Sequence, residues 1–318
     1  MSRAFIFPGQ GSQFVGMGKD LAETFIEARE VFQQVDDALS QHLSRLMFEG
    51  PEDQLNLTEN TQPALMAHSL AVGKILRKQG GIRFESACAF MAGHSLGEYS
   101  ALTCAGAFEL AQTARLLKVR GKAMQKAVPV GVGAMAAILG LDLPDVLEVT
   151  KKATAKSNQE VVCQAANDNS QGQVVVSGHS AAVQLAIDYA TEAGAKRAIL
   201  LPVSAPFHCS LMAPAAQEMA YALADSVIRP PCVPIVSNVT AKGVTEPSDI
   251  RRLLVDQITG MVRWRESVQW MKAQGVTEMV ELGAGKVLSG LVRRIEKDVA
   301  CESVGTPEGI EALIAKLK

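Results

Sequence analysis

The sequence has few aromatic residues and no excess of positive charge. Aromatic side chains make up 5% of the 318 residues, and the net charge is −2. Proteins that bind nucleic acid are typically basic, with aromatic side chains placed among their cations. We therefore expect no nucleic-acid partner.

Long apolar runs are also absent. No stretch of about 18 apolar residues occurs, which is the length that a membrane-spanning helix requires. The apolar run at 4–7 is too short for a secretory signal. We expect a soluble, cytoplasmic protein that makes no membrane contact.

The cysteines stand apart, and no two of them form a C-x-x-C pair. They are Cys88, Cys104, Cys163, Cys209, Cys232 and Cys301. Because several lie in apolar runs, we interpret them as buried thiols of a protein from a reducing compartment.

Two glycine-rich loops lack the spacing of nucleotide-binding motifs. After Gly9 and Gly11, Phe14 stands where the dinucleotide fingerprint needs a third glycine. Near the C-terminus, Val280 and Val287 replace the glycine and the hydroxyl residue of a phosphate loop. We reject both motifs. The first loop either aims backbone N–H groups at an anionic atom or is a plain strand-to-helix turn.

The most informative stretch is Gly93-His94-Ser95-Leu96-Gly97, between a short apolar run and a helix-compatible segment. Gly-x-Ser-x-Gly in this setting predicts a nucleophile elbow, a turn so tight that only glycine fits on either side of an exposed serine. The Leu96 N–H, at the start of the helix, is placed to stabilise a developing oxyanion. The alternative is a chance match in a glycine-rich chain.

The length suggests about two domains. Residues 130–202 predict the order β-α-β-β-α-β of a ferredoxin-like unit, with a polar turn at 167–172. Its strands are expected at 133–139, 161–165, 173–177 and 197–201, and its helices at 143–155 and 181–192. We interpret it as a domain inserted into a larger one formed by 1–129 and 203–318.

In the larger domain, apolar runs predict strands and apolar spacing predicts helices. Strands are expected at 4–7, 88–92, 233–237 and 277–281. Helices are expected at 21–47, 61–79 with Thr61 as N-cap, 98–102, 109–126, from 211, 249–259 and 266–274. We expect an α/β fold with a mainly parallel sheet.

A serine nucleophile needs a base, and histidine is the usual one near neutral pH. His42 and His68 lie in predicted helices, and His179 follows a strand without the second glycine of an elbow. His94 suits the lining of the pocket, because adjacent side chains on a sharp turn diverge. His208, in a loop that leaves the inserted domain, is the remaining candidate.

The third member of a triad is not evident. In the order Ser…Asp/Glu…His, the candidate acids are Asp142, Asp145, Asp168 and Asp188, all within the inserted domain. None of them is at an evident strand end of the main sheet, so we expect that an acid is absent and that a backbone carbonyl orients the histidine. The motif alone indicates a serine acyltransferase or a hydrolase.

Nine motifs, in order along almost the whole chain, resemble one family. They are 7–13, 60–64, 93–99, 120–121, 133–137, 172–175, 207–208, 262–264 and 283–288. Together they are similar to the malonyl-CoA:acyl carrier protein transacylase family, which includes acyltransferase domains of polyketide and fatty acid synthases. The resemblance implies an α/β-hydrolase-like large domain with a ferredoxin-like insertion.

The resemblance also implies roles for residues. Ser95 would be the nucleophile, His208 the base, and a backbone carbonyl near Gln257 the group that orients His208. The N–H groups of Gln10 and Leu96 would form the oxyanion hole.

Arg120 matches the family's arginine that binds the free malonyl carboxylate, for which a planar guanidinium is suited. Taken alone, it would be a solvated helix arginine. Gln62, His94 and Asn167 would line the pocket. Phe207 resembles the aromatic residue of malonyl-selective relatives, since a bulky ring leaves less room for an α-methyl group.

The implied reaction is a two-step malonyl transfer from malonyl-CoA to the phosphopantetheine thiol of acyl carrier protein, in support of fatty acid synthesis. We expect no metal, no permanently bound cofactor and a monomer. Lys196, Arg197, Lys286, Arg293 and Arg294 would dock the acidic carrier protein, or are simply solvated. The alternatives are a related acyltransferase for polyketides or polyunsaturated fatty acids, a serine esterase, and a non-enzymatic carrier-binding module.

Overall fold

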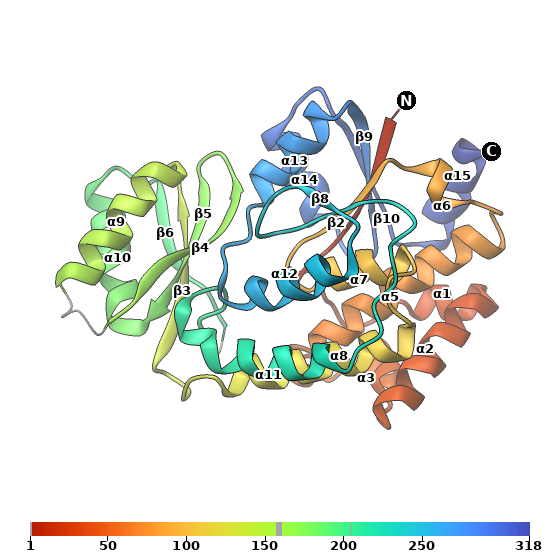
Figure 1. The fold of residues 1–318 in the computed structure, drawn as a ribbon, viewed down its shortest axis with the longest axis horizontal. Helices are drawn as coiled ribbons and strands as arrows, with labels where there is room; N and C mark the ends of the chain where they lie inside the picture. The colour runs from red at the N-terminus through yellow and green to blue at the C-terminus, as the bar shows by residue number, and fades with distance from the viewer. Residues whose placement is uncertain (1, 157–160, 204) are drawn as a thin grey trace.

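A mostly parallel sheet forms the centre of the larger of two lobes in the computed structural model, which describes residues 2–156, 161–203 and 205–318 (Figure 1). Its strand order is β10-β9-β1-β2-β7-β8, and only β8 is antiparallel to its neighbour. The strands are β1 (Ser2–Phe7), β2 (Phe90–Gly93), β7 (Ile235–Val236), β8 (Gly243–Val244), β9 (Val276–Leu282) and β10 (Ala300–Val304).

Strand β1 is central and apolar because both faces of the sheet are covered. Phe5 and Phe7 pack into one core cluster, whereas Ala4 and Ile6 pack into the other. Side chains alternate between the faces of a strand, so one short run supplies both cores. Helices α13 (Trp264–Ala273) and α14 (Val287–Ile295) cover the face of Ala4 and Ile6.

Most other helices belong to the opposite face or to the rim of the larger lobe (Figure 1). They are α1 (Lys19–Thr24), α2 (Ile26–Leu39), α3 (Leu43–Glu49), α4 (Glu52–Leu55), α5 (Thr58–Lys78), α6 (Phe84–Ala87), α7 (Gly97–Cys104), α8 (Leu110–Lys126), η1 (Ser210–Met212), α11 (Ala213–Ala224), α12 (Pro247–Thr259) and α15 (Pro307–Leu317).

The smaller lobe is the predicted ferredoxin-like unit. Its antiparallel sheet has the order β4-β5-β3-β6, and two helices pack on it. The elements are β3 (Gly133–Leu139), α9 (Leu143–Lys156), β4 (Cys163–Ser170), β5 (Gln173–His179), α10 (Ser180–Glu192) and β6 (Arg197–Leu200). The fold class is confirmed. Our proposed domain limits remain 1–129 with 203–318 for the larger domain, and 130–202 for the inserted one.

The structure corrects several local predictions. The helix expected at 21–47 is three helices, because the chain is extended at Phe25 and left-handed at Ser40. Thr61 is not an N-cap: α5 begins at Thr58, and the Thr61 hydroxyl donates to the Leu55 carbonyl (2.6 Å). The sequence patterns predict no helix or strand after residue 281, whereas the structure has α14, β10 and α15 there.

Two further expectations need correction. Most of the polar stretch 167–172 is strand rather than turn, because β4 continues to Ser170 and pairs with β5. Of the six cysteines, all free thiols, Cys232 is exposed and Cys301 is half-buried.

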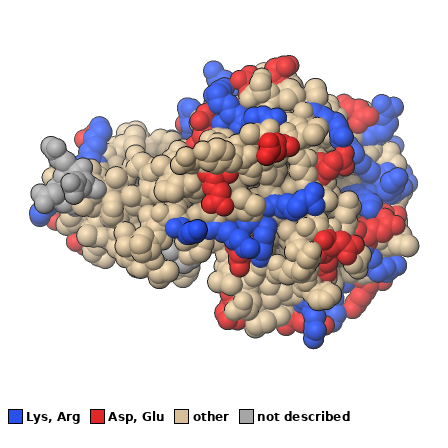
Figure 2. Space-filling view, turned by 60° about the horizontal axis from the view of Figure 1, so that its bottom comes forward, with Lys and Arg blue, Asp and Glu red and all other residues tan. Residues whose placement is uncertain are grey.

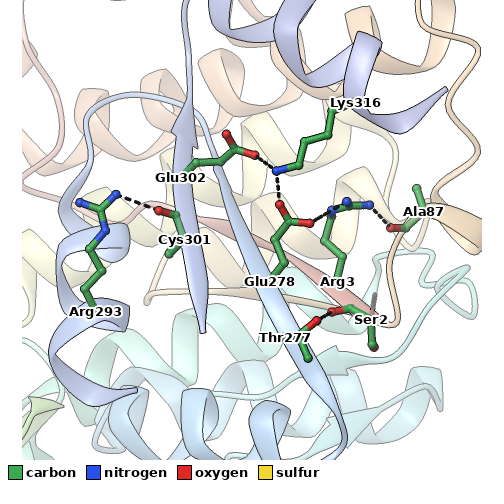
Figure 3. A network of polar contacts seen from close by, with 9 residues as sticks. All are labelled: Ser2, Arg3, Ala87, Thr277, Glu278, Arg293, Cys301, Glu302 and Lys316. Carbon is green, nitrogen blue, oxygen red and sulfur yellow. Dashed lines mark hydrogen bonds and ion pairs between the residues drawn. The ribbon is translucent and has the colours of Figure 1, made fainter. Parts of the chain in front are cut away.

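A polar network joins the far edge of the larger sheet to the C-terminal helix (Figure 3). Arg3 Nε donates to Glu278 Oε2 (2.7 Å), and Lys316 bridges the carboxylates of Glu278 and Glu302. Because these residues lie on β1, β9, β10 and α15, the network holds the two ends of the chain together. No helix within the described ranges is long and apolar enough to span a bilayer.

Removing the Phe5 ring tests how much the larger core contributes to the stability of the fold. Phe5 is fully buried and meets Phe84 edge to face, with ring centroids 5.6 Å apart. Replacing Phe5 by Ala should lower the free energy of unfolding by about 3–5 kcal/mol, because it leaves a cavity. The matched change at half-exposed Phe14 should cost about 0.5 kcal/mol or less in urea unfolding. Equal losses would contradict this description of the core.

Candidate active site

The serine lies on a backbone turn that only glycine neighbours permit. Ser95 follows β2 with a φ of +53°, in the left-handed region. A Cβ at Gly93 would lie 1.9 Å from the carbonyl carbon of Gly97, and one at Gly97 would lie 2.3 Å from the Phe7 oxygen. Neither position has room for a side chain, so the predicted elbow is formed.

His208 faces this serine. The Ser95 Oγ and His208 Nε2 atoms are 2.8 Å apart, and His208 Nδ1 lies 2.9 Å from the carbonyl oxygen of Gln257. A carbonyl only accepts hydrogen bonds, so Nδ1 carries the proton and Nε2 is left as the acceptor for the serine hydroxyl. In the described part of the chain, a backbone carbonyl takes the place of the acid.

Burial keeps the imidazole neutral. Loss of solvation, followed by the positive charge of Arg120, lowers the pKa of His208 to about 3. At neutral pH the ring is therefore unprotonated at Nε2 and able to take a proton.

Of the two other histidines predicted to lie in helices, His68 does so, whereas His42 lies just before α3. His42 is exposed at the start of α3, buried His68 contacts the Gly305 carbonyl, and His179 Nδ1 accepts from the Val162 N–H. His94 lines the same cavity as Ser95, and its Nε2 lies 2.8 Å from Asn169 Oδ1. Burial lowers the pKa of His94 as well.

Gln10 and Leu96 border the serine from the first loop and from the elbow. Within the described residues, neither backbone N–H has a hydrogen-bond acceptor. Leu96 is fully buried, and a buried N–H is nearly always paired. Its free N–H, with that of exposed Gln10 on the other side of the nucleophile, therefore indicates a place for an anionic oxygen.

Arg120 is 1% exposed and extends from α8 toward Ser95. Its Nη1 donates to Gln62 Oε1 (2.9 Å), and its Nη2 donates to Gln257 Oε1 (2.9 Å) and Ser95 Oγ (3.1 Å). These partners are neutral oxygens, so a buried cation faces the cavity and has no carboxylate among its hydrogen-bond partners in the described chain. Arg120 is therefore not the solvated helix arginine of the alternative interpretation.

The cavity has a volume of about 190 Å³. It brings together the sequence-predicted residues Gln10, Gln62, His94, Ser95, Leu96, Arg120, Asn167, Phe207 and His208. Asn167 and Asn169 reach it from β4, so the smaller lobe contributes one wall. Gln257 contacts His208 and Arg120 from α12 just behind the cavity.

Asn238 and Glu98, beside the elbow, were not predicted as site residues, and Gln257 was predicted only for its backbone carbonyl. Asn238 Oδ1 accepts from the Ser95 N–H (2.7 Å), and the Gln257 side-chain amide donates to the Ser95 carbonyl (3.0 Å). Glu98, 2% exposed, accepts from both residues, and burial raises its pKa to about 7. Glu98 lies within the motif at 93–99, whereas nothing in the sequence marks Asn238.

Cations gather where the two lobes meet (Figure 2). Of the five cations expected to dock a carrier protein, Arg294 donates to Gln173 Oε1 at the start of β5 (2.8 Å). Gln173 and Arg197 both pair with Leu139 of β3, from opposite sides of that strand. Arg293 instead donates to the Cys301 carbonyl of β10 (2.8 Å; Figure 3).

Comparison with known proteins identifies the family. Residues 4–307 match the family described as acyl transferase domain. The chain belongs to this acyltransferase family.

Relatives of similar length support this placement. The acyltransferase is 47% identical over 315 residues to the malonyl CoA-acyl carrier protein transacylase of Bacillus subtilis, covering 99% of this chain and 97% of that protein. The Escherichia coli K12 protein of the same name is 46% identical over 311 residues, covering 98% of each chain.

Solved structures agree. The acyl-carrier-protein S-malonyltransferase of Bartonella henselae superposes with a TM-score of 0.96 at 54% identity, covering 100% of this chain and 99% of that one. A malonyl-transacylase solved in complex with a type II polyketide acyl carrier protein has a TM-score of 0.95 at 41% identity, covering 99% and 100%. The resemblance found in the sequence is thus confirmed.

The buried neutral His208 makes stability depend on pH. Its pKa is lower in the folded than in the unfolded chain, so below about pH 6.5 only the unfolded chain binds the proton. The stability advantage of the wild type over His208→Gln should therefore shrink by up to about 1.4 kcal/mol per pH unit as the pH falls from 6.5 toward 4.

Urea unfolding of both proteins at several pH values measures this difference. A His42→Gln variant, altered at an exposed position, serves as control and should follow the wild type. A constant difference between wild type and His208→Gln would mean that His208 is protonated in the folded protein.

Proposed function

We propose that this acyltransferase transfers a malonyl group from malonyl-CoA to the phosphopantetheine thiol of an acyl carrier protein, through a malonyl ester of Ser95. One arrangement carries the proposal: a serine–histidine pair shares a small cavity with a buried arginine that faces the same serine oxygen. The names of the relatives point to the same reaction.

In the first half-reaction, His208 Nε2 takes the proton of the Ser95 hydroxyl as Oγ attacks the thioester carbonyl. The bond to sulfur then breaks, and His208 returns the proton to the leaving coenzyme A thiol. The Gln257 carbonyl holds the Nδ1 proton in place and stabilises the imidazolium that forms in between.

The negative oxygen of the tetrahedral intermediate binds to the free N–H groups of Gln10 and Leu96. Both are fixed by the backbone before the substrate arrives, so no reorganisation is needed as charge develops. The residues that activate the serine and hold this charge leave no task for a metal or a permanently bound cofactor.

The malonyl carboxylate binds to Arg120, whose planar guanidinium offers two parallel N–H donors. Gln62 and Gln257 hold that guanidinium in orientation. Phe207 borders the space beside the acyl group and favours malonyl over its α-methyl analogue. His94 and Asn167 complete the wall.

In the second half-reaction, the carrier thiol gives its proton to His208 and attacks the malonyl ester, and Ser95 recovers its proton. We place the reaction in the cytoplasm, in support of fatty acid synthesis, with the enzyme acting as a monomer. Lys196, Arg197, Lys286, Arg293 and Arg294 present positive charge to an acidic carrier protein.

The covalent intermediate tests the function directly. Wild-type protein incubated with malonyl-CoA should gain one malonyl group by intact mass, and holo acyl carrier protein should remove it. Ser95→Ala should gain none, whereas Ser86→Ala, altered at an exposed serine, should behave as wild type. Acylation of Ser95→Ala, or release of the malonyl group to water instead of the carrier, would contradict the proposal and favour another nucleophile or an esterase.

Substrate preference tests Arg120. Arg120→Ala should lower kcat/KM for malonyl-CoA by about 100-fold, because a charge-assisted contact with the carboxylate is lost, while acetyl-CoA is affected far less. Arg120→Lys should restore only part of the activity, because it offers no fork. Arg115→Ala, at an exposed position on the same helix, is the control. An unchanged preference for malonyl-CoA in Arg120→Ala would remove Arg120 from carboxylate binding.

A further inference from the structure

The side chain of Gln257 connects the groups that surround the nucleophile. Its Oε1 accepts from Arg120 Nη2 (2.9 Å), while its Nε2 donates to the Ser95 carbonyl (3.0 Å) and to Glu98 Oε2 (2.7 Å). Its backbone oxygen meets His208 separately. The amide therefore lies between a cation that binds substrate and a buried carboxyl group that does not.

Glu98 is at the inner end of this chain of contacts. The same oxygen, Oε2, also accepts from the Asn238 N–H (3.0 Å). Asn238 in turn accepts from the Ser95 N–H and donates to the Gly93 carbonyl, both at 2.7 Å. Glu98 thus holds the Gln257 side chain and the backbone of Asn238, the two residues whose side chains bind the backbone of the elbow.

An amide group can be turned over, and its surroundings decide which end faces which neighbour. If Gln257 were reversed, its NH₂ would face the donors of Arg120, and its oxygen would face the acceptor oxygens of Ser95 and Glu98. Every one of these contacts would become repulsive. Glu98 and Arg120 therefore admit a single orientation of the amide, in which its oxygen holds Arg120 Nη2.

We propose that Glu98 is a positioning residue that fixes the Gln257 amide and, through it, the orientation in which Arg120 receives the carboxylate of the acyl group. The inference rests on the proposed function, because it concerns selection of a malonyl over a neutral acyl group. Glu98 touches no reacting atom. Its effect reaches the substrate only through Gln257 and Arg120.

The test replaces Glu98 by Met and by Gln. Methionine keeps the length of the side chain but offers no oxygen to Gln257, so Glu98→Met should lower the ratio of kcat/KM for malonyl-CoA to that for acetyl-CoA by about 10-fold or more. Glutamine keeps an acceptor oxygen, so Glu98→Gln should stay within about 3-fold of the wild-type ratio.

Glu281 provides a matched control. It is equally buried, and its carboxylate accepts from the Leu288 and Ser289 N–H groups at the start of α14. Glu281→Met should lower the melting temperature but leave the malonyl-to-acetyl ratio unchanged. A structural role alone for Glu98 would likewise lower the activity with both substrates equally, and that result would overturn the inference.

If Glu98→Met does not fold, Gln257→Met addresses the same point, because it keeps the backbone carbonyl that His208 uses. It should reduce the ratio as Glu98→Met would, and an unchanged ratio would overturn the inference. When both single variants fold, the double variant should be no less selective than either one. Failure of the wild type to transfer malonyl would instead refute the proposed function, so the two failures are distinguishable.

Discussion

The proposed chemistry depends on one hydrogen bond, between the Ser95 hydroxyl and Nε2 of His208. The two residues are 113 positions apart in the chain. The bond has the right direction only because the other ring nitrogen faces the Gln257 carbonyl. A carbonyl can only accept, so it fixes the tautomer as a carboxylate would, without adding a second buried charge. Burial then keeps the ring neutral, which is the state that a general base needs.

A second constraint is the burial of Arg120. Removing a cation from water is costly unless hydrogen bonds replace its hydration, and Gln62, Gln257 and Ser95 supply oxygens for three of them. Glu98 lies one amide group away, so the pocket holds a positive charge at its surface and an acidic group behind it. This layering leaves the guanidinium free to pair with a substrate carboxylate.

Much of this could be predicted from the sequence, because the elbow is a local motif and the split β-α-β-β-α-β order is legible in apolar periodicity. Ser95 and the ferredoxin-like insertion follow from such patterns, whereas Arg120 and the Gln257 carbonyl came only from family resemblance. Asn238 had no signal, since its role arises from contacts with residues more than 140 positions away. The stretch 167–172 was misjudged because Asn and Asp are typical of turns, yet pairing with β5 overrides that preference.

The state of the imidazole in solution tests the central claim most directly. Nitrogen NMR of histidine-labelled enzyme, with His208 assigned by comparison with His208→Gln, reports which ring nitrogen carries the proton. At pH 7 the account predicts a neutral ring protonated at Nδ1 and bare at Nε2. A charged imidazolium, or a neutral ring protonated at Nε2, would contradict it.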